Sequence, residues 1–420
     1  MERDPPEGSV SPAAGTYAAL MTVAAFPATG VRSSLLAGFR PRTGPPSTAA
    51  VLRSALWPAA ILTVLHHSFV VATNGGGDYK PVYRAVFNFT KGWDIYNEHL
   101  DYVDVHYLYP PGGTLLLAPF GYLPFEASKN WFIVMNAVAM LLAWYLLLRM
   151  FGFALASVAA PALLLAMFST ETVVSTFWWT NINGLDLLLV VAFFRWLLDG
   201  RTSRQWWAGL AIGVTLVCKP LLLPLLLIPL MRGQWPVRDE PQAAGAARPR
   251  LLRGIACYVA TAQWRAALAA IVVPIVFNAV AWPLLSDPMD YVTRILPYVM
   301  DVRDYANYSV AGVGLYYGLP ASLILLLRVV FAMLGVGSLW LLYRYYRTRE
   351  PLLWMLTSSG VLLTTSWLVS TLGQHYYSMM LFPFLMTVVL PNSVLRNWPA
   401  WLAIYGFLTP DMWWVWHWPA

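Results

Sequence analysis

The chain has 420 residues, of which 59% are hydrophobic and only 11% are charged, and its formal net charge is +7. Soluble domains carry roughly 25% charged residues, so this composition excludes an ordinary soluble protein. Apolar runs of about 18 residues or more recur along the chain, and each is long enough to cross a lipid bilayer. The excess of arginine is what cytoplasmic loops of a membrane protein require, so it does not point to nucleic acid.

The N-terminal segment, residues 1–50, is rich in Pro, Ala, Gly and Ser, and we expect a disordered cytoplasmic tail. Residues 51–420 are expected to form one transmembrane domain. The first span is predicted at 52–72, and the arginines that precede it place the N-terminus in the cytoplasm. A long polar loop, 73–111, should then lie on the periplasmic side.

The rest of the chain is predicted to form further spans at 130–149, 154–170, 184–198, 266–284, 319–343, 351–371, 377–392 and 399–416. Segment 112–124 is too short to cross and should be re-entrant or interfacial. Segment 207–231 is interrupted at Lys219-Pro220, which predicts one broken helix or two half-spans. Segment 232–265 is basic and should be a cytoplasmic loop. The prediction is an all-α polytopic membrane protein with about ten or eleven transmembrane helices.

Asp78 follows the first span after three glycines, which let the backbone turn sharply. It can be interpreted as a general base held at the membrane surface, able to take a proton from a hydroxyl group. It can equally be a solvated acid beside a helix end, and spacing alone leaves both interpretations open.

Two further charges lie in apolar surroundings. Lys219 should face a cavity or a partner, where an ammonium group could contact a phosphate, or it snorkels to an interface. Arg328 lies near the middle of its span and needs an ion-pair partner or a phosphate.

Several neutral side chains on the predicted outer face are candidates for binding. His375 beside Gln374 could donate to a phosphate or a sugar, or be structural. The run with Tyr107 and Tyr109 would suit a sugar-stacking platform, or simply a hinge. No metal-ligand spacing and no nucleotide-binding motif is present, so we expect no metal and no cofactor, and an activated donor would have to come from the membrane.

An acid just outside the first span, a long loop that reaches Tyr109-Pro110-Pro111, and the break at Lys219-Pro220 together resemble the polyprenyl-phosphate-sugar-dependent glycosyltransferases of the GT-C fold. Longer strings are similar to the mycobacterial α-(1→3)-arabinofuranosyltransferases, namely 34–44, 80–86, 92–98, 106–111, 376–383 and 392–401. The basic segment 236–263 looks like an insertion relative to this family.

This resemblance implies an enzyme whose GT-C catalytic domain spans 51–420, with its active site on the periplasmic face of the plasma membrane. The donor would be decaprenyl-phospho-β-D-arabinofuranose and the acceptor the 3-hydroxyl of cell-wall arabinan, in arabinogalactan or lipoarabinomannan. Inversion would give an α-(1→3) branch. Asp78 would be the base, Lys219, His375 and Lys80 would bind the donor phosphate, and sugar or acceptor contacts would come from Tyr79, Tyr107, Tyr109 and Gln374.

Two other functions are compatible with the same residues. A polyprenyl-phosphate-mannose-dependent mannosyltransferase would keep the scaffold and the base, with a different sugar pocket. A lipid-linked sugar flippase or transporter would need the phosphate-binding charges but no base.

Overall fold

The computed structural model describes residues 47–96, 99–102, 105–234, 250–305 and 307–408, and within these ranges the chain forms helices and no strand. The all-α prediction is thereby confirmed. The chain divides into two compact units, Met1–Leu52 and Arg53–Ala420, and the second contains the candidate site and all the helices described below except the first residues of α3. The tail predicted over 1–50 lies almost wholly outside the described residues, as does much of the predicted insertion.

Within the described residues, five helices are long and apolar enough to cross a membrane. They are α3 (Thr48–Leu65, continued by the π-helical η2, His66–Val71), α7 (Phe125–Met150), α14 (Trp264–Ala281, continued by η5, Trp282–Leu284), α17 (Ala321–Tyr345) and α18 (Pro351–Val369). A bent pair, α8 (Ala159–Phe168) and α9 (Glu171–Trp179), makes a sixth candidate, broken by an angle of 56°. The chain is therefore a multi-pass membrane protein.

This number is lower than the ten or eleven spans expected, for two physical reasons. The helices α10 (Asn183–Asp199) and α11 (Thr202–Cys218) have 17 residues each, at the lower limit for a span. Segment 377–392 is divided into the short helices η7 (His375–Leu381), α19 (Phe382–Leu385) and η8 (Met386–Val389). The final helix, α20 (Trp398–Leu408), is described only to Leu408.

Segments predicted as loops also contain helices. Residues 73–111 include α5 (Tyr79–Lys91), and 112–124 are mostly taken up by the short helices α6 (Pro111–Leu117) and η3 (Ala118–Tyr122), which are too short to cross. The other short helices are α4 (Ala72–Asn74), η4 (Pro220–Leu226), α12 (Leu227–Met231), α13 (Arg250–Thr261), η6 (Tyr291–Ile295), α15 (Leu296–Met300), α16 (Val310–Tyr316) and η9 (Val394–Arg396).

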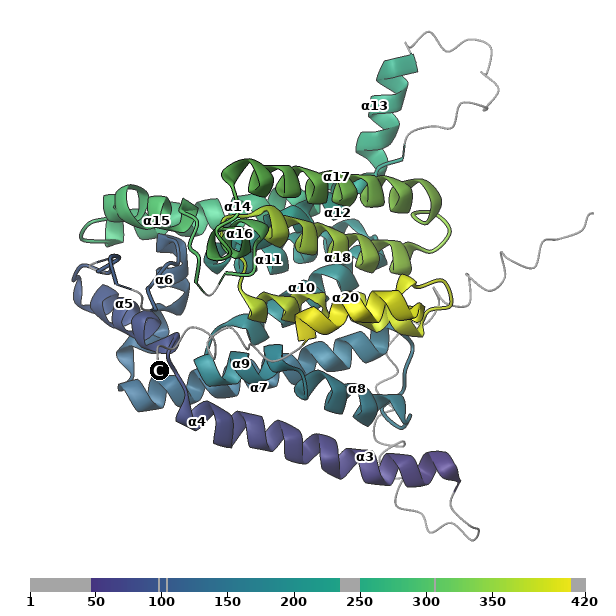
Figure 1. Ribbon diagram of the computed structural model, residues 1–420, viewed down its shortest axis with the longest axis horizontal. Helices are drawn as coiled ribbons and strands as arrows, with labels where there is room; N and C mark the ends of the chain where they lie inside the picture. Colours follow the sequence, from purple (N-terminus) through teal and green to yellow (C-terminus); the bar gives the residue numbers. More distant parts are fainter. Residues whose placement is uncertain (1–46, 97–98, 103–104, 235–249, 306, 409–420) are drawn as a thin grey trace, which may run out of the picture. The chain divides into compact units, whose positions relative to one another are not determined.

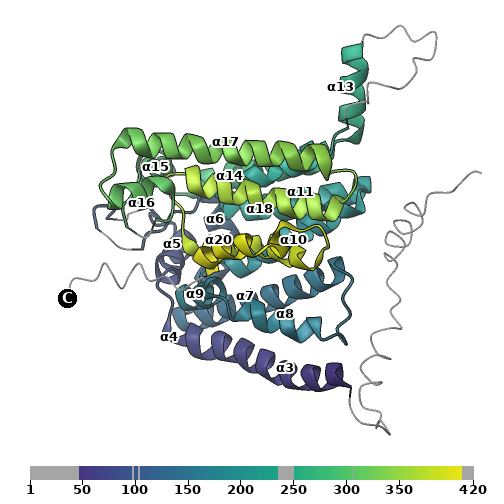
Figure 2. The same ribbon diagram turned by 45° about the vertical axis from the view of Figure 1, so that its right-hand side comes forward.

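The long helices of the second unit run side by side, with α10 between α7 and α11, and α11 against α14 (Figures 1 and 2). At one end of this bundle lie α5, from the predicted periplasmic loop 73–111, and α6, from the short segment that follows it, together with α15. The helix α13, from the predicted basic cytoplasmic loop, projects at the other end. This separation agrees with a single topology for all loops.

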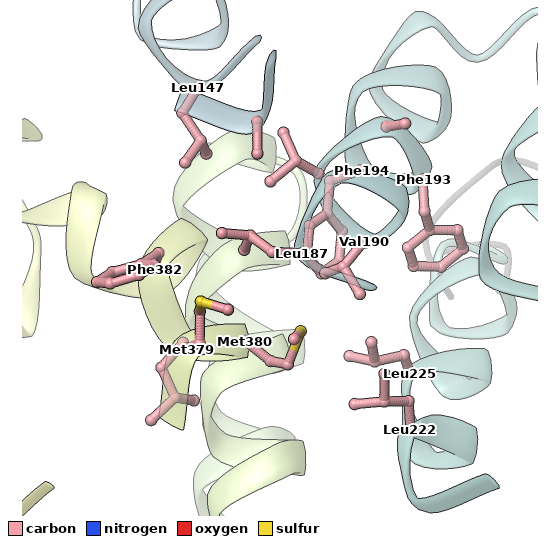
Figure 3. Close-up of a cluster of buried hydrophobic side chains, with 14 of the residues drawn as sticks. Leu147, Leu187, Val190, Phe193, Phe194, Leu222, Leu225, Met379, Met380 and Phe382 are labelled. Atoms are coloured by element: carbon pink, nitrogen blue, oxygen red, sulfur yellow. The ribbon is translucent and has the colours of Figure 1, made fainter. Parts of the chain in front are cut away.

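The main hydrophobic core lies between α7, α10, η4 and η7 (Figure 3). Leu187 and Val190 of α10 meet Met379 and Met380 of η7 there, and all four side chains are buried. This packing holds η7 against α10 although the two elements are far apart in sequence. It thereby brings the residues at the start of each element, and those just before it, into one polar cluster.

Candidate active site

The segment with Asp78 rests on the end of α9. The backbone N–H of Gly76 donates to the carbonyl of Trp178 at 2.7 Å, and that of Asp78 donates to the carbonyl of Trp179 at 3.1 Å. Gly76 has φ +115°, a conformation that other residues rarely adopt. A Cβ atom at Gly75 would lie only 1.7 Å from the carbonyl oxygen of Trp178. The glycines therefore allow a close backbone approach that fixes the start of α5, and with it Asp78.

Lys219 lies where α11 breaks. The helix ends at Cys218, Lys219 leaves the helical conformation at φ −129° and ψ 80°, and Pro220 begins η4. The predicted interruption of segment 207–231 is confirmed. Only 7% of Lys219 is exposed, so its charge needs partners inside the protein.

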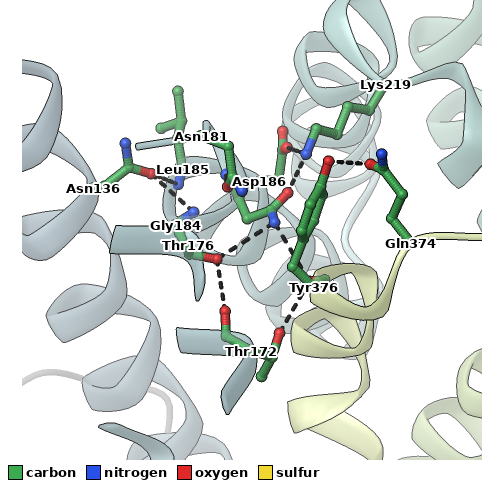
Figure 4. Close-up of polar contacts among 11 residues, drawn as sticks. Asn136, Thr172, Thr176, Asn181, Gly184, Leu185, Asp186, Lys219, Gln374 and Tyr376 are labelled. Carbon is green, nitrogen blue, oxygen red and sulfur yellow. Dashed lines mark hydrogen bonds and ion pairs between the residues drawn. The ribbon is translucent and has the colours of Figure 1, made fainter. Parts of the chain in front are cut away.

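Those partners come from α10 and η7 (Figure 4). The Nζ atom of Lys219 lies 3.6 Å from Oδ2 of Asp186 and also donates to Oδ1 of Asn183. The same atom lies 5.7 Å and 5.6 Å from the ring centres of Tyr376 and Tyr377, within cation–π range. Lys219 is thus held between a buried carboxylate and two aromatic faces.

The N-terminus of α10 is fixed from a neighbouring helix. Oδ1 of Asn136, on α7, accepts from the backbone N–H groups of Gly184 at 2.9 Å and Leu185 at 3.3 Å, the role of an N-cap. Just before α10, Thr180 has φ 55°, which is costly for a β-branched residue. This turn places Asn181, Asn183 and Asp186 on the polar cluster.

The segment that enters η7 closes the cluster. Oγ1 of Thr172 donates to the carbonyl of Tyr376 at 3.0 Å, and Nδ2 of Asn183 approaches the same oxygen at 3.4 Å. The Tyr376 hydroxyl donates to Oε1 of Gln374. Two stretches separated by 204 residues therefore share the site.

The carboxyl group of Asp78 faces this cluster. Burial raises its pKa from 3.8 to about 6, against the lowering effect of the Lys219 charge and of the polar side chains of Asn181 and Tyr376. A carboxyl group with this pKa is mostly ionised at neutral pH and is a competent base there.

The structure brings together Asp78, Lys219 and Gln374 of the predicted site residues. Burial raises the pKa of the Tyr109 hydroxyl, and so do the neighbouring Cys218, Asp186 and Asp78. Tyr109 therefore lies close to this group.

Lys80, Tyr79 and Tyr107 lie in other surroundings. Lys80 is exposed, and the side chain of His375 lies outside the described part of the structure. Tyr79 is 1% exposed, with its hydroxyl 2.5 Å from Oγ of Ser128, and Tyr107 is fully buried, with its hydroxyl 2.7 Å from Oγ1 of Thr114. Both rings are packed inside the protein, and the sugar or acceptor contacts expected of Tyr79 and Tyr107 stay predictions.

Sequence reasoning missed Asp186, Asn181 and Asn183. Asp186 had a usable signal, because a carboxylate within the apolar segment 184–198 is a functional candidate by default. The asparagines gave no such signal. Arg328 proves structural: its Nε and Nη2 atoms donate to the carbonyl of Val369 at 2.9 Å and 2.6 Å, at the C-terminus of α18.

Comparison with known proteins assigns the chain to a class. The model of glycosyltransferase family 87 matches residues 107–238 and 252–371. The chain belongs to glycosyltransferase family 87. The break between the matched segments falls inside the predicted insertion 236–263.

Curated relatives of this family 87 enzyme carry a more specific name. The chain is 62% identical over 404 residues to the alpha-(1->3)-arabinofuranosyltransferase of Mycobacterium tuberculosis. The aligned region covers 96% of the chain and 87% of the relative. It is 58% identical over 406 residues to the protein of that name from Mycolicibacterium smegmatis, with the same coverage of 96% and 87%. The Corynebacterium glutamicum protein of that name is 41% identical over 359 residues, 84% of the chain and 78% of the relative.

The family 87 match includes Asp186 and Lys219 and ends before Gln374. Among the residues that the structure describes, no group of three or more His, Cys, Asp or Glu side chains could hold a metal ion. The described site of this membrane glycosyltransferase consists of two carboxyl groups, one ammonium group and a surround of amides and phenols.

Proposed function

We propose that this enzyme transfers D-arabinofuranose from decaprenyl-phospho-arabinofuranose to the 3-hydroxyl of a cell-wall arabinan, forming an α-(1→3) linkage with inversion. The names of its curated relatives support the sugar and the linkage. The mechanism is carried by one observation: the buried carboxyl group of Asp78, with a pKa near 6, faces Lys219. The site would open to the periplasmic side of the plasma membrane, a placement supported by the positive charge of the loops at the opposite end.

The reaction needs one base and one leaving group. Asp78 would accept the proton of the acceptor 3-hydroxyl while that oxygen forms a bond to the anomeric carbon. The bond between this carbon and the phosphate oxygen would break, and its electron pair would leave with decaprenyl phosphate. Attack opposite to the leaving group converts a β donor into an α product.

Lys219 would act on both the base and the leaving phosphate. Its charge favours the ionised form of Asp78. The same ammonium group would contact a phosphate oxygen of the donor and stabilise the charge that develops there. Gln374 and Tyr109 would contact the sugars, His375 and Lys80 would supply further phosphate contacts, and Tyr79 and Tyr107 would act through packing.

An apolar groove beside the site suits a polyprenyl chain. It has a volume of about 420 Å³ and is lined by α6, α11, η4, α14 and η6. Leu216 and Pro220, which flank Lys219 in the sequence, line it, and so do Pro110 and Pro111, which follow Tyr109. A lipid held there would present its phosphate next to Lys219.

Two alternatives are set against this proposal. Membership of a glycosyltransferase family favours transfer over a flippase. A mannosyl donor would use the same base, so the choice of sugar in this proposal is supported by the identity to named arabinofuranosyltransferases alone.

The deciding experiment is transfer by purified protein in detergent or nanodiscs, with either decaprenyl-phospho-arabinofuranose or decaprenyl-phospho-mannose and a synthetic arabinan acceptor. Linkage analysis of the product should show a new 3-linked arabinofuranose with the first donor only. Product from the mannosyl donor alone, or a linkage to another hydroxyl, would overturn the proposed specificity.

A further inference from the structure

Lys129 is a buried cation outside the polar cluster. It lies in the second turn of α7, where only 7% of the residue is exposed. Its Nζ atom donates to the backbone carbonyls of Gly75 at 2.7 Å and Thr73 at 3.2 Å. These are carbonyl groups at the C-terminus of the first span, which lack intrahelical donors and favour a positive charge.

The loop that carries Asp78 is therefore held from two sides. Lys129 binds it from α7 through the carbonyls of Thr73 and Gly75. The end of α9 binds it through the carbonyls of Trp178 and Trp179, which accept from the N–H groups of Gly76 and Asp78. All four contacts involve its backbone, so together they fix where Asp78 enters α5.

The contacts of Lys129 are with the backbone of the loop, so we expect it to act through the position of that backbone. A Cβ atom at Gly76 would lie 3.1 Å from Cε of Lys129, so the lysine stem also packs directly under the loop. Moving Lys129 would let the loop shift toward α7.

We propose that Lys129 is a positioning residue for sugar transfer, which holds the Asp78 loop at the distance that proton abstraction requires. This inference rests on the proposed role of Asp78 as the base. A displacement of about 1 Å at a reacting group can lower a rate by about 10²-fold. Donor binding at Lys219 uses other elements and should be little affected.

The test compares Lys129→Met, which keeps the stem and removes the donors, with Lys129→Gln, which keeps one kind of N–H donor. For each, kcat and the donor KM are measured per mole of monodisperse protein. We expect kcat to fall about 10–100-fold for Met and less for Gln, with donor KM within threefold of the wild type. The pH below which kcat/KM falls, which reports the ionisation of Asp78, should not change.

Arg232→Met is the matched control, because Nη1 of Arg232 donates to the carbonyl of Leu197 near the C-terminus of α10, at 3.1 Å. It removes a similar helix-end cation and should leave kcat within twofold. Asp78→Asn is measured in parallel. If Asp78→Asn remains active, the proposed function fails; if it is inactive while Lys129→Met keeps full kcat, only the role of Lys129 fails. Failure of both Lys129 variants to fold would also overturn the proposal, since Lys129 would then be needed for stability.

Discussion

Nζ of Lys219 lies 3.6 Å from Oδ2 of Asp186, and both side chains are almost completely buried. Asp78 faces the same lysine, so one ammonium group serves two carboxyl groups. In the proposed mechanism, Asp186 would hold the lysine in place and Asp78 would accept the proton.

The first prediction concerns Asp78 as the base. Asp78→Asn keeps the size of the side chain but removes its basicity, so kcat should fall by about 10²–10⁴-fold, the usual contribution of a general base. Donor affinity, measured by binding of radiolabelled lipid donor, should change little. Asp287→Asn, at an exposed acid between η5 and η6, is the control and should behave as the wild type. Full activity of Asp78→Asn would rule out the mechanism.

The second prediction concerns pH. The base must be ionised, so kcat/KM should rise with pH through about 6 and then level off. Lys219 favours the ionised form, and Lys219→Met should therefore move this limb to higher pH and also raise the donor KM. Lys91→Met, at an exposed residue at the end of α5, should move neither. A shifted limb with an unchanged donor KM would show that Lys219 serves Asp78 alone.

The third prediction concerns the buried ion pair. Asp186→Asn leaves the Lys219 charge without its ion-pair partner on α10, which should destabilise the protein by about 3–5 kcal/mol and lower its Tm. Asp199→Asn is the control, because Asp199 pairs with the largely exposed Arg201 at 3.2 Å. Such surface pairs contribute about 0–1 kcal/mol. Equal Tm values for the two variants would contradict the role assigned to Asp186.

The fourth prediction concerns the glycine loop. Gly75→Ala would place a Cβ atom against the carbonyl of Trp178, so the loop must move and transfer should be lost. Gly92→Ala tests the cost of backbone conformation alone, because Gly92 has φ +70° with nothing within 4 Å of its Cβ position. It should cost roughly 1–2 kcal/mol of stability and leave kcat unchanged. Comparable loss of kcat in both variants would argue against close contact as the cause.

The sequence predicts part of this site for reasons that are physical. Hydrophobic length reveals spans, and a proline after a lysine reveals the break at Lys219, because both are local properties. Which helix faces meet is not local. Lys129 and Asn136 carry no local signal in the sequence, because their roles depend on how α7 packs against the end of the first span and against α10.

The bond from Thr172 to the carbonyl of Tyr376 joins residues 204 positions apart, and this has a consequence for biosynthesis. At about 5–20 residues per second, the ribosome needs roughly 10–40 seconds to travel that distance. For most of this interval Lys219 and Asp186 are in the nascent chain, but the tyrosines that cover them, Tyr376 and Tyr377, have not been made. Assembly of the reaction centre is thus one of the last events in the synthesis of the polypeptide.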